Sequence, residues 1–228
     1  MMSLPALKVK RTNEMNTLTL HNTLPKVFAG REDTGSEIWL RDVVFERGKH
    51  YLISAESGTG KTSLCSYLYG YRTDYSGTMT FDGRDIRELS ILEWCNIRTH
   101  HIAYLAQDMK LFAELTSLEN IILKNSITNH KSESEILEML NVLGLSDKVN
   151  TPIDKLSIGQ QQRVAIIRTL CQPCDFILLD EPVSHLDDAN NATVSKLILD
   201  EAQKQGAGVI ATSVGNNVKI SVDKEFKL

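Results

Sequence analysis

Short apolar runs alternate with longer amphipathic segments along most of the chain. The runs are too short to be helices, and several are apolar at nearly every position, which is typical of strands buried on both faces of a sheet. They cover residues 17–20, 38–45, 51–55, 102–106, 176–179 and 209–212. We expect a strand at each of these places.

Two of the intervening segments are predicted to be helices from their apolar spacing and capping residues. In the first, Ser132 and Glu135 form a capping box, and Gly144 can end the helix. Its apolar residues recur at helical spacing and are Ile136, Met139, Leu140 and Leu143. A second helical pattern covers residues 194–202 and ends near Gly206.

Strands that alternate with helices predict an α/β fold with a mostly parallel sheet covered by helices on both faces. Residues 108–154 contain helical patterns but no convincing strand, which indicates an inserted helical subdomain. We therefore expect a tail over residues 1–14 and a single domain over residues 15–228. Its α/β core would comprise about 15–107 and 160–228, and its helical subdomain about 108–159.

Composition narrows the class of protein. The 228 residues include 25 Lys and Arg against 29 Asp and Glu, a formal net charge of −4, so a partner recognised through basic charge, such as nucleic acid, is not expected. Hydrophobic residues make up 42% and charged residues 24%, as in globular proteins that dissolve in water. No apolar run approaches the ~20 residues of a membrane helix, so no span is expected. The amino terminus has its basic residues after a short apolar piece, the wrong order for a secretory signal, and we therefore expect a cytoplasmic protein.

The cysteines and histidines show neither a disulfide framework nor a metal-ligand spacing. Cys171 and Cys174 form a CxxC pair without a second pair at zinc spacing, so a structural or solvent-facing loop is expected. His100, His101 and His185 lack partners at ligand spacing and are expected to be polar surface residues.

A strand, a glycine-rich loop and a helix start follow one another at residues 51–64, the arrangement that binds nucleoside triphosphates. Backbone N–H groups at Gly58 and Gly60 can cradle phosphate oxygens, Lys61 can reach the β- and γ-phosphates, and the Thr62 hydroxyl can ligate Mg²⁺. Ala55 replaces the first glycine of the general pattern, and it would distort the loop if that position needed a positive φ. The alternative interpretation is an ordinary Gly-Ser turn before Lys-Thr.

Two further segments carry polar groups suited to the same chemistry. The apolar run at 176–179 leads to Asp180, which can hold the Mg²⁺ shell, and to Glu181, which can orient or deprotonate an attacking water. Ser157 and Gln160 form a capping box at a helix start, which offers a second anion site. Taken singly, an Asp-Glu pair after an apolar strand is more often a solvated strand end than a catalytic pair, and most capping boxes only cap a helix.

The three segments in this order resemble an ATP-binding cassette ATPase, a P-loop NTPase, over about residues 15–212. Residues 55–63 resemble the Walker A loop, Gln107 the Q-loop glutamine, residues 156–160 the signature motif, residues 177–182 the Walker B strand and residues 184–187 the D-loop. The resemblance implies a RecA-like core with an N-terminal antiparallel β portion. It implies ATP and Mg²⁺ as ligands, with Mg²⁺ held by Thr62, Gln107 and Asp180 and catalysis by Glu181, Lys61 and Gln107.

The resemblance also implies which residues contact ATP and which partners the chain has. Ser157 and Gly159 of one subunit would close over ATP held by Lys61 of the other, in a homodimer or a heterodimer, and Met109, Leu111 and Phe112 would face a separate membrane permease. The protein would then lie on the inner face of the cell membrane. Phe28 would stack on adenine, although an ordinary core role is nearly as well supported. The expected ATP contacts are Phe28, Ser57, Gly58, Thr59, Gly60, Lys61, Thr62, Ser63, Ser157, Gly159, Gln160 and Asp187.

Two further departures from the family pattern affect the expected activity. Ile158 stands where the signature has glycine, and Ser213 stands where the family has a histidine that contacts the γ-phosphate. A regulatory subunit that binds ATP but hydrolyses it poorly is therefore the alternative function. A cassette acting on nucleic acid is disfavoured by the net charge and by the short 119-residue interval from Lys61 to Asp180. The stretch from 85 to 123 is similar to the subfamily for lipoprotein release, macrolide export and cell division.

Overall fold

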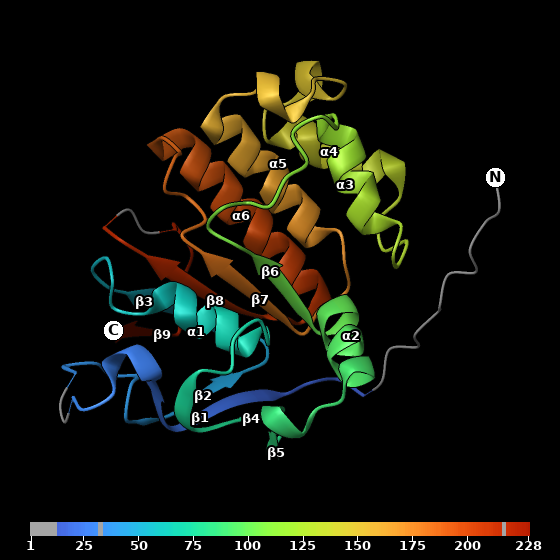
Figure 1. Cartoon of the computed structure of the whole chain (residues 1–228). Helices are drawn as coiled ribbons and strands as arrows, with labels where there is room; N and C mark the ends of the chain where they lie inside the picture. Colours follow the sequence, from blue (N-terminus) through green and yellow to red (C-terminus); the bar gives the residue numbers. More distant parts are fainter. Residues whose placement is uncertain (1–12, 32–33, 216–217) are drawn as a thin grey trace.

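Over residues 13–31, 34–215 and 218–228, which the computed structural model describes, the chain forms nine strands and six α-helices (Figure 1). The strands are β1 (Thr17–Pro25), β2 (Asp42–Glu46), β3 (His50–Ser54), β4 (Tyr75–Phe81), β5 (Arg84–Asp85), β6 (Ile102–Leu105), β7 (Phe176–Asp180), β8 (Gly208–Ser213) and β9 (Lys224–Lys227). The helices are α1 (Lys61–Leu68), α2 (Ile91–His100), α3 (Ser117–Asn125), α4 (Glu133–Val142), α5 (Ile158–Leu170) and α6 (Asp188–Gln205). Residues 1–12 of the predicted tail lie outside the described residues.

The predicted α/β fold class is confirmed by two sheets of different kinds. The larger has the order β6-β7-β8-β3-β9, and every neighbouring pair in it is parallel. The smaller has the order β2-β1-β4-β5 and is antiparallel throughout, which is the β portion that the family resemblance implied. Figure 1 shows α5 and α6 on one side of the parallel sheet and α1 on the other.

Alternate residues of the parallel strands enter two separate hydrophobic cores. On β7, Ile177 and Leu179 join the core that includes α5 and α6, whereas Phe176 and Leu178 join the core that includes α1 and the antiparallel sheet. Successive side chains of a strand point to opposite faces, so a run that is apolar at every position fits a strand covered twice. This explains why the runs that form β6 and β7 are apolar at nearly every position.

The predicted helix boundaries are confirmed where capping residues define them. Ser132 and Glu135 form a complete capping box before α4, and Ser157 and Gln160 form one before α5. Gly144 and Gly206 adopt left-handed φ angles of 65° and 61° after α4 and α6, a conformation that glycine reaches without strain.

The strand predicted over residues 38–45 is wrong in its first half, since β2 begins only at Asp42. The Ser36 hydroxyl accepts hydrogen bonds from the backbone N–H groups of Ile38 and Trp39, which forms a local turn. Leu40 then has a φ of 59°, outside the range of a strand. Strands β4, β5 and β9 were not among the predicted ones.

Residues 108–154, all of which the structure describes, contain α3 and α4 and no strand beyond one isolated bridge between Thr116 and Pro152. Figure 1 shows these helices at one end of the molecule. The division into a core and a helical subdomain at 108–159 stays a prediction. Within the described ranges, every helix is too short or too polar to cross a membrane.

Candidate functional site

The carboxyl ends of three parallel strands place the candidate residues at one edge of the sheet. β3 leads into the glycine-rich loop, β7 ends at Asp180, and β8 ends at Ser213. The register pairs Asp180 with Thr212 and Ser54 with Ser213, so these ends lie side by side. In open parallel sheets, ligands bind beyond the carboxyl ends of the strands.

The loop between β3 and α1 has the conformation that its glycines permit. Gly58 and Gly60 have φ angles of 83° and 104°, which a side chain would strain. The described residues with positive φ do not include Ala55, so alanine at this position does not distort the loop. A Cβ on Gly60 would lie 3.1 Å from the ring of Trp39, whose Nε1 donates a hydrogen bond of 3.0 Å to the Thr59 carbonyl.

Lys61, the first residue of α1, is buried over this loop. Its Nζ donates a 2.7 Å hydrogen bond to the Glu56 carbonyl and lies 3.7 Å from Glu181 Oε1. The ammonium group therefore stands between the loop and the carboxylate that follows β7. An anion bound on the loop would meet this positive charge.

Asp180 and Glu181 differ sharply in their surroundings. Asp180 is fully buried, and its Oδ1 accepts a 2.8 Å hydrogen bond from the Thr212 hydroxyl. Burial raises the pKa of Asp180, against the opposing effects of the Thr212 hydroxyl and the Lys61 charge. Glu181 is partly exposed, and its backbone has a φ of 53°, so the chain turns sharply where β7 ends.

Gln107 connects the carboxylate that follows β7 to the first turn of α1. Its Nε2 donates to Glu181 Oε2 at 3.3 Å, and its Oε1 accepts from the Thr62 hydroxyl at 3.4 Å. Gln107 follows β6, and Thr62 belongs to α1. The structure thus brings together Lys61, Thr62, Gln107 and Glu181 from three places in the sequence.

The residues at this edge fit Mg²⁺, a cation that prefers oxygen ligands and keeps waters and phosphate oxygens in its shell. The buried Oδ2 of Asp180 has no hydrogen-bond partner among the described residues. The Thr62 hydroxyl and the Gln107 amide oxygen supply further oxygen atoms nearby. No group of three or more His, Cys, Asp or Glu side chains suited to a metal occurs in the described ranges.

The start of α5 is exposed and lies directly against the loop after β7. A Cβ on Gly159 would lie only 2.9 Å from the His185 carbonyl oxygen, so glycine allows this close approach. Ile158, the neighbouring residue, is 49% exposed. Within the described residues no hydrogen bond joins residues 157–160 to the phosphate loop. Their predicted meeting, with residues of one subunit closing over ATP held by another, stays a prediction.

Gln162 is a residue of this region that sequence reasoning missed. Its buried side chain donates to the Glu181 carbonyl at 3.1 Å and to the Ser184 hydroxyl at 3.3 Å, and it accepts from the His185 N–H at 3.1 Å. It therefore fixes the path of the chain after the carboxylate. Of the three consecutive glutamines 160–162, only Gln160 gives a sequence signal, because it forms the capping box before α5.

Asp187 and Phe28 have clear structural contacts. Asp187 caps α6 by accepting from the Asn190 N–H at 2.8 Å, and this bond holds the pKa of Asp187 below its ordinary value. Phe28 is only 9% exposed, and the Arg31 guanidinium lies 4.8 Å from its ring centre. The adenine-stacking role of Phe28 stays a prediction beside this core position.

The expectation that His101 is a surface residue is wrong. His101 is 2% exposed, and its Nδ1 lies 2.6 Å from Asp175 Oδ2. Asp175 is 74 residues away in the sequence, so the residues near His101 gave no indication of this partner. Cys171 and Cys174 are buried, and burial raises the pKa of Cys171 to about 12, so both are structural thiols rather than parts of a solvent-facing loop.

Comparison with known proteins identifies the class of this fold and site. The family model described as ABC transporter matches residues 41–184. An uncharacterized ABC transporter ATP-binding protein, YclH of Bacillus subtilis, is 33% identical over 82% of this chain and 83% of its own length. The macrolide export ATP-binding/permease protein MacB of Mannheimia succiniciproducens is 32% identical over 90% of this chain, which spans only 32% of that relative.

A solved structure leads to the same family. The dimeric structure of MJ0796, a bacterial ABC transporter cassette, has a TM-score of 0.73 and 26% sequence identity, and the match covers 86% of this chain and 87% of that one. The family match covers more than half of the chain, and it includes the glycine-rich loop, Gln107, Asp180 and Glu181. The chain therefore belongs to the ABC transporter family and is one of its ATP-binding cassettes.

Proposed function

We propose that this cassette binds ATP with Mg²⁺ at the edge formed by β3, β7 and β8, hydrolyses it, and thereby drives a separate membrane permease. The observation that carries the proposal is the convergence of Lys61 and Gln107 on the Glu181 carboxylate, at 3.7 Å and 3.3 Å. A cation for phosphate, a carboxylate for water and an amide between them are the groups that phosphoryl transfer requires.

The roles follow from the contacts. The loop amides and Lys61 hold the β- and γ-phosphates, and Glu181 accepts a proton from the water that attacks the γ-phosphorus. The bond between that phosphorus and the bridging oxygen breaks, which yields ADP and phosphate. Bound Mg²⁺, held by Asp180, Thr62 and Gln107, would neutralise charge on the phosphate oxygens.

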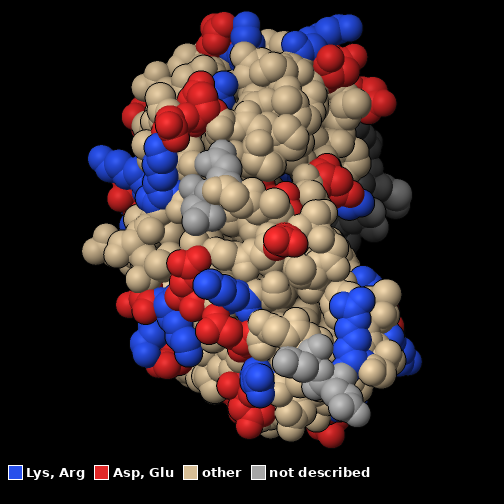
Figure 2. Space-filling model, turned by 90° about the vertical axis from the view of Figure 1, so that its left-hand side faces the viewer, with Lys and Arg blue, Asp and Glu red and all other residues tan. Residues whose placement is uncertain are grey.

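Closure would occur between two copies, or between this chain and another cassette. Ser157 and Ile158 are exposed at the start of α5, where they are free to meet a second subunit. Figure 2 shows the face at which β7 and β8 end, with few charged side chains across its middle and charged groups above and below. Such a surface can approach another protein without strong charge repulsion. The MJ0796 cassette, which is dimeric by its title, supports the same arrangement.

A permease would supply the membrane part of the transporter. MacB combines ATP-binding and permease functions in its name, whereas YclH, which this chain matches over 83% of its length, is named only as an ATP-binding protein. On the family resemblance we propose a separate membrane permease, which would hold the cassette at the cytoplasmic side of the membrane. The transported molecule would be chosen by that permease, and macrolide export or lipoprotein release are the candidates that the subfamily suggests.

ATP binding and turnover by the purified full chain test this proposal. We expect Glu181→Gln to lower turnover by at least ~100-fold, the contribution of a general base, while ATP affinity is retained. Glu114→Gln, an exposed carboxylate on the same chain, is the matched control and should turn over like the wild type. If the wild type binds ATP but turns it over no faster than Glu181→Gln, the result would favour the alternative function. The chain would then be a regulatory subunit whose hydrolysis is weakened by Ser213 and Ile158. Absence of ATP binding would refute both.

A further inference from the structure

Trp39 packs against the phosphate loop, which comprises residues 55–60 between β3 and α1. The indole is only 2% exposed, and its Nε1 donates a 3.0 Å hydrogen bond to the carbonyl of Thr59, 20 residues further along the chain. A Cβ on Gly60 would lie 3.1 Å from a ring carbon of Trp39 and 3.2 Å from the ring of Phe28. The indole therefore fills the space on the interior side of the peptide that joins Thr59 to Gly60.

The backbone around Trp39 is fixed without help from the loop. The Ser36 hydroxyl accepts the Trp39 N–H at 2.9 Å, and the N–H of the next residue, Leu40, donates to the Thr23 carbonyl of β1 at 2.9 Å. Leu40 has a φ of 59°, a left-handed conformation that a residue with a side chain keeps only where its surroundings hold it. The antiparallel sheet, rather than the phosphate loop, thus sets the position of the indole.

The bond from Trp39 constrains the orientation of the peptide between Thr59 and Gly60. This peptide is trans, as is every peptide bond in the described part of the chain, so its C=O and N–H groups point in opposite directions. Because the Thr59 carbonyl is turned inward to the indole, the Gly60 N–H is turned outward. Within the described ranges that N–H donates no hydrogen bond, so it is available to an anion on the outer side of the loop.

The orientation of this peptide matters for anion binding. Backbone N–H groups attract an anion, whereas carbonyl oxygens repel it. Without the indole N–H the peptide could rotate, and the Thr59 carbonyl would then face the anion in part of the population. A group that is already held in its binding orientation binds more tightly, because ordering it on binding costs no further free energy.

We propose that Trp39 is a positioning residue for the nucleotide phosphates, because its indole N–H keeps the Gly60 N–H directed at the anion. The inference rests on the proposed function for the identity of that anion as the triphosphate of ATP. It adds a residue outside the glycine-rich loop that determines how tightly the loop binds phosphate. The effect concerns binding, since bound phosphates themselves hold the peptide once ATP occupies the site.

Nucleotide binding to the full chain with Trp39→Phe tests the proposal, since phenylalanine keeps an aromatic ring and lacks the N–H. The probes are ATP and tripolyphosphate, each with Mg²⁺, and isothermal titration calorimetry gives their dissociation constants. We expect both constants to rise by the same factor, about 3- to 10-fold, as for one lost hydrogen bond. The KM for ATP should rise by this factor, whereas kcat should stay within about twofold of the wild type.

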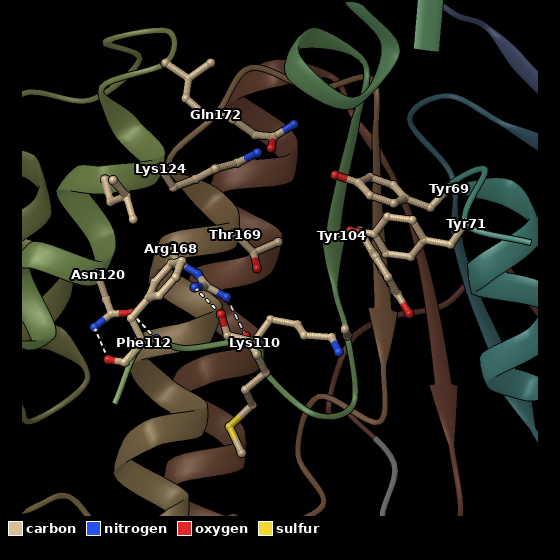
Figure 3. Close-up of a pocket in the computed structure, with 14 residues that line it drawn as sticks. Tyr69, Tyr71, Tyr104, Lys110, Phe112, Asn120, Lys124, Arg168, Thr169 and Gln172 are labelled. Carbon is tan, nitrogen blue, oxygen red and sulfur yellow. Dashed lines mark hydrogen bonds between the residues drawn. The ribbon is translucent and has the colours of Figure 1, made fainter. Parts of the chain in front are cut away.

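Two further proteins separate this role from a loss of packing. Site-specific replacement of Trp39 by benzothienylalanine, whose sulfur takes the place of the N–H, keeps the shape of the indole and should weaken binding as Trp39→Phe does. Tyr69→Phe is the matched control, because it removes one polar atom from another buried aromatic residue of the same hydrophobic core. Tyr69 follows the opposite end of α1 and packs beside Tyr71 and Tyr104 (Figure 3), so this variant should bind both probes like the wild type.

Three results would overturn the role of Trp39. These are unchanged affinity for both probes in the benzothienylalanine protein, weaker binding of ATP with unchanged binding of tripolyphosphate, and an equal loss of affinity in Tyr69→Phe. The second result would place Trp39 at the base or ribose instead. If Trp39→Phe does not fold, the benzothienylalanine protein alone decides. A wild type that binds neither probe refutes the proposed function and this inference with it, whereas wild-type binding that the Trp39 replacements leave unchanged refutes only the inference.

Discussion

A buried ion pair links the chain before α4 to α6, and removal of one of its partners is predicted to destabilise the fold strongly. Lys131 Nζ lies 2.5 Å from Glu201 Oε2, and both residues are buried. The side chain of Asn125 fixes Lys131 further, since it bonds to both the N–H and the carbonyl of that residue. Lys204 supplies a second contact, 2.6 Å from Glu201 Oε1.

The substitution Lys131→Met should lower the free energy of unfolding by about 3 kcal/mol. Removing one partner of a buried pair costs about 3–5 kcal/mol, and the lower end applies because Lys204 still neutralises Glu201. For a chain of this size, that loss corresponds to a fall in Tm of about 6–12 °C. Urea unfolding at pH 7, followed by circular dichroism, measures it.

A double variant and an exposed control make this prediction refutable. Lys131→Met with Glu201→Leu removes both charges and should be more stable than Lys131→Met alone, because no buried carboxylate then loses its partner. Lys148→Met, which breaks a partly exposed pair with Asp147, should leave the free energy of unfolding unchanged within about 0.5 kcal/mol. The reasoning is wrong if Lys131→Met matches the wild type, or if the double variant is weaker than Lys131→Met.

Three further predictions concern the site and the pH dependence of stability. Gly159→Ala should lower both ATP turnover and Tm, because its Cβ would lie 2.9 Å from the His185 carbonyl; a variant with unchanged turnover would contradict this. The fluorescence of Trp39, which contacts the phosphate loop, should respond to ATP; Trp39→Phe should remove the response, and Trp94→Phe should preserve it. Burial raises the pKa of Glu201, but hydrogen bonds and charges from Lys131 and Lys204 outweigh burial and hold this pKa below its ordinary value in the folded protein. The ionised Glu201 carboxylate therefore stabilises the fold above the pKa of the unfolded chain. This stabilisation is lost as pH falls through the lower pKa of the folded protein. Acid should therefore destabilise the wild type more steeply than Glu201→Gln below about pH 4, and parallel curves would refute this.

The sequence was sufficient for the parts of the fold that local physics defines. Apolar runs located β3, β6, β7 and β8, and capping residues located α4 and α5. The same signals could have located more. Ser90 with Glu93 and Thr116 with Glu119 form complete capping boxes before α2 and α3.

Other features depend on contacts that a single sequence does not reveal. Strand β4 carries Ser76, Gly77 and Thr78 at its centre, and a Cβ on Gly77 would lie 2.3 Å from the Asn22 carbonyl of the neighbouring strand. Its glycine therefore reflects backbone contact across the sheet rather than a loop. The burial of His101 likewise depends on a partner far away in the chain.

In the candidate site, motifs located most of the groups but not what holds them in place. The sequence could predict that Lys61, Asp180 and Glu181 lie close together, because each follows a strand and parallel strands end at the same edge of the sheet. The bonds of Gln162 to the chain after Glu181 could not, since glutamine on a helix gives no signal of what it will contact.

The contacts of Gln107 have a thermodynamic consequence if the proposed function holds. Its amide contacts Thr62 and Glu181, and only Asp108 and Met109 separate it from Lys110, whose carbonyl accepts a hydrogen bond from Arg168. If ATP affinity depends on the placement of Gln107, a partner that favours one placement would change the affinity for ATP. ATP would then change the affinity for that partner by the same factor, because the coupling free energy between two binding sites is reciprocal.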